Sequence, residues 1–258
     1  MLGTAAGTQG DQYGVSFSGS TSSESTFIVE GINTTDTAFG GQSSNLPNEF
    51  IEETEVIAGG YNAEFGRSTG GVINVVTKQG SNKFKGSIFA YYTPGTLVAK
   101  GEPILREGSS LGTESNLNYA SDLGFEVGGP IIKDKLWFHV GANPSFSKTV
   151  VDRITSSQVD KDNDGNPDID PDTDLLVTEE VGRHPYSRTL KTAFFTAKIN
   201  GAVSENHQFQ VSAFGNPRSA DRDFYRITAN RAASIYRFDD GAYDAAVKWT
   251  SKLFENKT

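Results

Sequence analysis

From Lys83 onward, apolar and polar residues alternate with a period of two. The segments that show this pattern are 123–128, 136–143, 192–200, 208–213 and 244–253. Within 136–143, the apolar set is Leu136, Phe138, Val140 and Ala142. Successive side chains of a β-strand point to opposite faces, so each segment predicts a strand with one apolar and one polar face. This part of the chain is therefore expected to form an antiparallel sheet.

Connection lengths distinguish a soluble sandwich from a membrane barrel. Short links at 133–135 and 201–206 alternate with long polar links at about 94–119, 151–187 and 217–240. Outer-membrane barrels have short periplasmic turns and longer external loops, whereas long structureless loops are uncommon in compact soluble domains. We therefore predict transmembrane β-barrel strands with the apolar face toward lipid and the long links outside the cell.

Composition agrees with a barrel and excludes several other classes. Hydrophobic residues make up only 36% of the 258 residues, which is low for a compact soluble core of this size. No apolar run reaches the ~18 residues of a transmembrane helix. The net charge of −9 argues against a nucleic-acid partner, because such partners require a basic surface. The chain has no cysteine, which excludes disulfides and thiolate metal sites.

Residues 1–82 have a different pattern, typical of a mixed α/β domain. Short strands are predicted in 16–19, 26–31, 54–58 and 71–78. Pro47 is followed closely by the acids Glu49, Glu52 and Glu53, an arrangement that favours the start of a short helix.

The segment 47–86 carries the most specific motif. It contains the strand 55–57, an Ala-Glu-Phe-Gly-Arg turn at 63–67, and a glycine pair followed by the apolar run 72–76. This order resembles the end of the plug domain of TonB-dependent outer-membrane receptors, most of all their Oar-like branch. Many siderophore receptors have Arg-Gly-Pro after the first strand, whereas this chain has Ala-Gly-Gly at 58–60.

The resemblance implies a structural or gating role for a set of plug residues. They are Glu55, Glu64, Gly66, Arg67, Gly70 and Gly71. The glycines are expected where the plug chain folds back, because glycine accepts positive φ. Glu64 and Arg67 are expected to hold the plug against its surroundings, the alternative being a surface ion pair of little energetic value.

The resemblance also implies the domain organisation. An α+β plug domain, of which residues 1–82 are the C-terminal part, is followed by antiparallel transmembrane β-barrel strands in 83–258. A plugged transporter barrel needs about 22 strands, and this chain holds about six. We therefore expect a partial barrel, in a chain truncated at both ends.

The function implied by the resemblance is energy-coupled uptake across the outer membrane of a Gram-negative-type bacterium. Expected partners are an unidentified extracellular ligand, outer-membrane lipid, and TonB, which would bind a segment preceding residue 1. No cofactor is required for this function.

An acidic segment in the second long link predicts a calcium site. Asp160, Asp162, Asp164 and Asp168 place carboxylates at positions one, three, five and nine, with Gly165 at position six. This spacing matches the start of a calcium loop. The twelfth position is proline rather than a bidentate acid, and a solvated acidic loop is the alternative interpretation.

Two other functions agree less well with the sequence than uptake does. Residues 66–70 fit the G-x-S-x-G nucleophile elbow, but a β-branched run follows where that motif needs a helix. We therefore expect no catalytic residue and no enzyme. A secreted or surface calcium-binding β-domain acting in adhesion is the alternative; it explains the acidic segment and alternating strands but not the plug-like motif.

Overall fold

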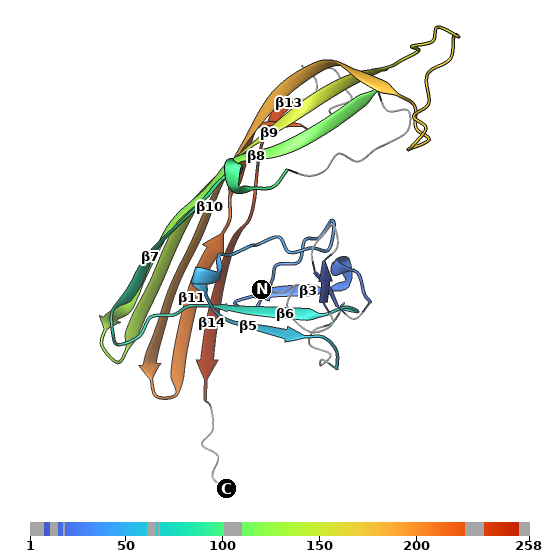
Figure 1. The fold of residues 1–258 in the computed structure, drawn as a ribbon. Coiled ribbons are helices and arrows are strands. Elements are labelled where there is room, and N and C mark those ends of the chain that lie inside the picture. Colours follow the sequence, from blue (N-terminus) through green and yellow to red (C-terminus); the bar gives the residue numbers. More distant parts are fainter. Residues whose placement is uncertain are drawn as a thin grey trace.

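Long antiparallel strands form a curved wall, and a smaller N-terminal sheet lies against one face of its lower half (Figure 1). The computed structural model describes residues 8–10, 15–17, 19–60, 66, 68–100, 110–224 and 235–252. No helix in this part of the chain is long and apolar enough to cross a membrane.

The wall is an eight-stranded sheet of order β13-β12-β10-β9-β8-β7, in which β11 pairs with β10 and β14. Its elements are β7 Lys85–Pro94, η5 Gly95–Leu97, β8 Leu111–Ile132, β9 Leu136–Gln158, β10 Thr178–Ser204, β11 His207–Gly215, β12 Arg218–Phe224, β13 Ile235–Asp240 and β14 Tyr243–Ser251. Pro217, which has no backbone N–H, separates β11 from β12, and Gly241 separates β13 from β14. The wall is open, because β7 and β14 each have one partner among the described strands.

The N-terminal part forms a four-stranded sheet of order β4-β3-β6-β5 and the small pair β1-β2. Its elements are β1 Thr8–Gly10, β2 Val15–Phe17, η2 Ser22–Glu24, β3 Thr26–Val29, β4 Ile32–Asn33, η3 Asn48–Phe50, β5 Ile51–Ile57 and β6 Val72–Thr77. β3 and β6 are parallel, and the other pairs are antiparallel. The core of this region is apolar, with Phe27, Val29, Ile73 and Val75 all buried.

The wall has the opposite arrangement: its apolar face is exposed and its polar face is covered. Outward-facing Leu123 and Val247 are 58% and 79% exposed, whereas inward-facing His139 and Thr196 are 4% and 3% exposed. A sheet of this kind does not bury its apolar face in a core. The arrangement is that of a membrane barrel, whose apolar face meets lipid.

Several sequence expectations are confirmed. The short link predicted at 133–135 joins β8 to β9, and the one predicted at 201–206 is the shorter turn 205–206 between β10 and β11. The predicted strands 26–31, 54–58 and 71–78 correspond to β3, β5 and β6, within a few residues.

The helical part of the predicted α+β domain is wrong for the described residues. Pro47 does precede a helical turn, but this is the single 3-10 turn η3. The chain enters β5 immediately afterwards, at the β-branched Ile51. Because β-branched residues favour strands, the predicted helix does not extend.

The predicted long links are present, but they are shorter than expected. β8 begins at Leu111, β9 continues to Gln158, and β10 begins at Thr178, so strands occupy the outer parts of 94–119 and 151–187. β12 and β13 likewise occupy much of 217–240. Beyond the apolar band both faces of these strands mix polar with apolar residues, such as Val150, Val151 and Ile154 of β9. The period-two pattern therefore disappears although backbone pairing continues.

Candidate functional site: the buried polar contact between the N-terminal sheet and the wall

The contact centres on Glu30, in the turn between β3 and β4. Glu30 and Gly31 have φ values of 54° and 81°. Two successive residues with positive φ are typical of the tight type I′ hairpin turn. Positive φ is uncommon for a non-glycine residue, so this backbone is held by its surroundings. The turn presents the Glu30 side chain to the wall.

Four donors surround the Glu30 carboxylate. Thr77 donates from its backbone N at 2.6 Å and from Oγ1 at 2.7 Å, both to Oε1. Lys198 Nζ, from β10 of the wall, lies 2.7 Å from the same oxygen. Gln210 Nε2, from β11, donates to Oε2 at 2.6 Å. We call Glu30, Thr77, Lys198 and Gln210 the Glu30 cluster.

Burial makes this cluster energetically important. The side chains of Lys198 and Glu30 are 1% and 2% exposed. Lys198 Nζ also donates to the Thr77 carbonyl at 2.6 Å, so both charges have hydrogen-bond partners as well as each other. A buried ion pair contributes little net stability when intact, but removing one partner leaves the other charge buried and unpaired, which destabilises the fold.

A second ionic contact lies beside the first. Lys78 Nζ lies 2.7 Å from Glu126 Oε1 on β8, and Ser87 Oγ donates to that oxygen at 3.1 Å. His139 Nε2 on β9 is 3.4 Å from Glu126 Oε2. Glu126 Oε2 and both ring nitrogens of His139 are buried without a hydrogen-bond partner among the described residues.

One aromatic residue packs into a gap in the wall. Phe50 of η3 is fully buried, and its ring lies 6.3 Å from that of Phe89 in an edge-on arrangement. A Cβ at Gly141 would lie 2.6 Å from the Phe50 ring, and one at Gly124 would lie 2.2 Å from Phe89. The two glycines therefore make the room that these rings occupy.

Other contacts join the N-terminal region to the wall with polar groups. Tyr91 Oη donates to Glu49 Oε1 at 2.7 Å, and Ser44 Oγ donates to the Asp244 carboxylate. Asn216 Nδ2 donates to the Ser43 carbonyl at 3.4 Å. The contact is thus largely polar, with Phe50 and Phe214 as its buried apolar residues.

The glycine pair of the plug motif lies at close packing points. A Cβ at Gly70 would lie 2.8 Å from Ser20 Oγ, and one at Gly71 would lie 2.6 Å from the Phe17 ring. Neither glycine has a positive φ. Their requirement is therefore for space rather than for a left-handed backbone, and their gating role stays a prediction.

The other motif residues lie apart from the Glu30 cluster. Glu55 is an exposed residue of β5, paired with Asn74 of β6. Gly66 is exposed, and Glu64 and Arg67 lie outside the described residues. The role predicted for the last two therefore also stays a prediction.

Ser68, the serine of the G-x-S-x-G match, has no nucleophile-elbow context. Its Oγ donates to the backbone carbonyls of Glu24 and Gly71 at 3.3 and 3.2 Å. The strand β6 follows it where the hydrolase motif needs a helix.

The acidic loop between β9 and β10 brings three of its four predicted ligands together. Carboxylate oxygens of Asp160, Asp162 and Asp168 lie within 4.8 Å of one another. The Asp164 carboxylate instead accepts the Asn166 backbone N at 2.7 Å. The Asp160 and Asp162 carboxylates accept backbone N–H groups of the loop, so they have partners without an ion. Calcium binding stays a prediction.

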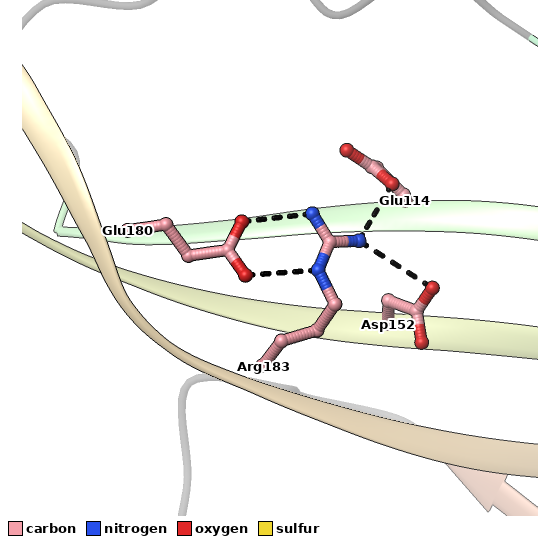
Figure 2. A network of polar contacts seen from close by, with 4 residues as sticks. All are labelled: Glu114, Asp152, Glu180 and Arg183. Atoms are coloured by element: carbon pink, nitrogen blue, oxygen red, sulfur yellow. Dashed lines mark hydrogen bonds and ion pairs between the residues drawn. The ribbon is translucent and has the colours of Figure 1, made fainter.

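A separate polar network joins the upper parts of three strands (Figure 2). Arg183 Nε and Nη2 bind the two Glu180 oxygens at 2.9 and 2.8 Å, and Nη1 lies 2.9 Å from Glu114 and 3.5 Å from Asp152. Glu114 and Asp152 are direct cross-strand partners. Like charges in such pairs destabilise a sheet, so Arg183 offsets their repulsion. Its hydrogen bonds lower the pKa of Glu180.

Sequence reasoning did not identify the Glu30 cluster. Two signals were available in the sequence. Glu30 precedes a glycine directly after the first apolar strand, and Lys198 is the one charged residue between Thr192 and Asn200, on the polar face of its strand. Neither shows which partner the charge meets, because the two residues are 168 positions apart.

Comparisons with known proteins agree with the architecture. Residues 76–200 match the family model described as outer membrane beta barrel domain. The TonB-dependent transporter Oar of Myxococcus xanthus is 42% identical over 217 residues, which is 83% of this chain and 20% of that protein. A probable TonB-dependent siderophore receptor of Acinetobacter baumannii, PirA, is 35% identical over 44% of this chain and 13% of its own length.

Among solved structures, the siderophore receptor PirA from Acinetobacter baumannii overlaps 93% of this chain and 38% of its own. The identity is 21% and the TM-score 0.41, and nothing further follows from this overlap. The chain thus spans about a fifth or less of the length of these two curated relatives. Those relatives are a TonB-dependent transporter and a probable TonB-dependent receptor, so neither an enzyme nor an adhesion domain is supported. The chain belongs to the family of TonB-dependent outer-membrane receptors.

Proposed function

We propose that this chain takes part in TonB-dependent, energy-coupled uptake of an extracellular ligand. In this proposal the N-terminal sheet acts as a plug inside the barrel, and the wall from Lys85 onward forms the first barrel strands. TonB supplies the energy for plug movement, and the upper strands and their connections contact the ligand outside the cell.

The observation that carries the proposal is the Glu30 cluster. A plug must close the barrel at rest and yet release when pulled. An apolar interface would resist water, whereas the groups around Glu30 and Lys198 can exchange each hydrogen bond for one with water. The contact is buried and specific at rest, because every charge in it is paired, and it becomes hydrated when the plug moves.

The closing role can be tested in planar lipid bilayers. The full-length gene product is expected to conduct little current, and deletion of residues 1–82 is expected to open a stable pore. Equal conductance with and without these residues would contradict the plug role.

Energy coupling needs a separate test in cells. A single cysteine in place of Thr77, in a receptor without other cysteines, reports whether the buried contact opens. Labelling by a membrane-impermeant maleimide should be several-fold greater in cells with TonB, grown in complete medium, than in cells lacking it. Labelling that is independent of TonB would overturn the proposed coupling.

A further inference from the structure

The outward face of the wall contains a groove that the uptake function does not use. Its floor crosses β9, β10 and the links that follow β11 and β13, through residues that lack large flexible side chains: Pro144, Ala193, Pro217 and Gly241. Ala193 pairs with Pro144, and its backbone N donates to the Pro217 carbonyl at 2.9 Å. A Cβ at Gly241 would lie 2.7 Å from Pro217 Cα, so only glycine fits beside this proline. The resulting groove has a volume of about 590 Å³.

The groove has one border of mainly polar residues and one aromatic border. Along one side, Phe146, Lys191, Ser219 and Asp239 are successive cross-strand partners. On the other side Tyr243 is 74% exposed and lies 6.0 Å, ring to ring, from Phe195.

The groove lies at the upper edge of the apolar band. About ten residues separate Leu136 from Phe146, about 33 Å of strand, which at a tilt near 40° spans the ~25 Å height of an outer-membrane apolar band. Counted from the short turn after β10, Lys191 is the first charged residue on the outward face of that strand. Counted from Ser251 back through β14 and β13, Asp239 is the first charged residue on the outward face. In the orientation proposed above, this edge meets the outer leaflet.

The charges in the groove leave one cation available. Asp240 is paired with Arg218, and Asp239 lies 3.4 Å from Arg237 Nε. Lys191 has no ion pair or side-chain hydrogen bond among the described residues. A lysine at a membrane interface places its stem along apolar surface and its ammonium among headgroups.

We infer that this groove binds a phosphorylated lipid of the outer leaflet. The Lys191 ammonium binds a headgroup phosphate, and an acyl chain lies on the floor of small residues between Phe146 and Tyr243. Charge complementarity selects an anionic headgroup, because the two neighbouring carboxylates already have cationic partners.

The test is native mass spectrometry of the full-length gene product, solubilised in mild detergent and titrated with lipid A as the phosphorylated lipid. Lys191→Gln removes the cation, and Ala193→Phe fills the floor with a side chain that the apolar face tolerates. Lys191→Gln should weaken lipid A binding about tenfold, the factor for one lost charge-assisted contact. Ala193→Phe should weaken it as well, because the ring takes the place of the acyl chain. The matched control Lys135→Gln, in the turn at the opposite end of the wall, should bind as the unaltered protein does.

Two further arms define the ligand. Dephosphorylated lipid A should bind as weakly as phosphorylated lipid A binds the Lys191→Gln variant, and inorganic phosphate alone should not compete at micromolar concentration. Binding unchanged in both groove variants, or lost equally in Lys135→Gln, would overturn the inference. The lipid-binding inference rests on the proposed orientation, so outer-membrane insertion is measured first. A receptor that fails to insert contradicts the proposed function. An inserted receptor without selective binding contradicts this inference alone.

Discussion

The N-terminal sheet and the wall apply the same two-residue periodicity with opposite results. In the N-terminal sheet Val29 and Val75 are buried in an apolar core. In the wall Val140 and Val247 are exposed, and the polar residues that alternate with the apolar ones along each strand face inward. The difference shows that burial follows the surrounding solvent. Water drives valine inward in the first sheet, and lipid accommodates it on the outside of the second.

At their contact, each region has residues that differ from its general pattern of burial. The N-terminal sheet buries the charge of Glu30 at its margin, and the wall buries that of Lys198. The wall in turn contributes one apolar inward residue, Phe214, to the N-terminal core. The contact is therefore specified by exceptions to both patterns.

The largest expected effect comes from breaking the charged contact on one side only. Lys198→Met should leave the Glu30 carboxylate buried without a cation, at a cost of about 3–5 kcal/mol. Hydrogen exchange of the β3 and β6 amides measures the resulting loss of protection.

The double variant Glu30→Gln with Lys198→Met is the matched control. It removes both charges, and it should recover most of the protection lost in the single variant. If the single and double variants were equally destabilised, packing rather than charge would hold the contact.

The next largest effect tests the lipid-facing side. Val140→Arg should impair assembly by about 2–4 kcal/mol if the residue lies near the membrane midplane. Ser145→Arg, on the inward face of the same strand and nearer its polar end, should be tolerated better. Heat-modifiable migration on gels measures assembly in the outer membrane, and equal behaviour of both variants would refute the assigned facing.

A smaller effect is expected from calcium at the loop between β9 and β10. If the site has a Kd of ~10⁻⁴–10⁻³ M, millimolar calcium stabilises the bound loop by about 0.4–1.4 kcal/mol. Isothermal calorimetry should detect binding that Asp160→Asn with Asp162→Asn abolishes. Asp164→Asn should reduce it less, because Asp164 lies outside the carboxylate cluster. Absence of heat at millimolar calcium would leave a solvated acidic loop.

The smallest effect concerns pH in the upper network. The pKa of Glu180 is lowered by its hydrogen bonds to Arg183, so its stabilising contribution is present above the unfolded-state pKa. It is lost as the pH falls through the lower folded-state value. Resistance of this region to proteolysis should therefore be unchanged from pH 8 to 6 and decline only in strong acid. Arg183→Gln should lower resistance already at pH 7, and an Arg183→Gln variant identical to the unaltered protein would show that the network is not stabilising.

The sequence predicted the parts of the fold that depend on local pattern. Alternation around Val140 and the short turn 133–135 were sufficient to predict strand positions and their facing. Where this alternation ends, in the upper strands, pattern alone could not show pairing, because strands with mixed residues on both faces resemble loops. Long-range pairs such as Glu30 with Lys198 could not be predicted from the sequence pattern either, since nothing near either residue identifies its partner.

The central claim, that the wall is apolar outside and polar inside, can be tested with the two tryptophans of the chain. The two residues lie at nearly the same height in the sheet, on opposite faces. Trp249 is 58% exposed on the outward face, whereas Trp137 on the inward face donates from Nε1 to Asn82 Oδ1. The measurement is fluorescence quenching by brominated lipids in vesicles, using Trp137→Phe and Trp249→Phe to leave one tryptophan each. The account predicts strong quenching when Trp249 remains and weak quenching when Trp137 remains. Equal quenching, or the reverse order, would contradict it.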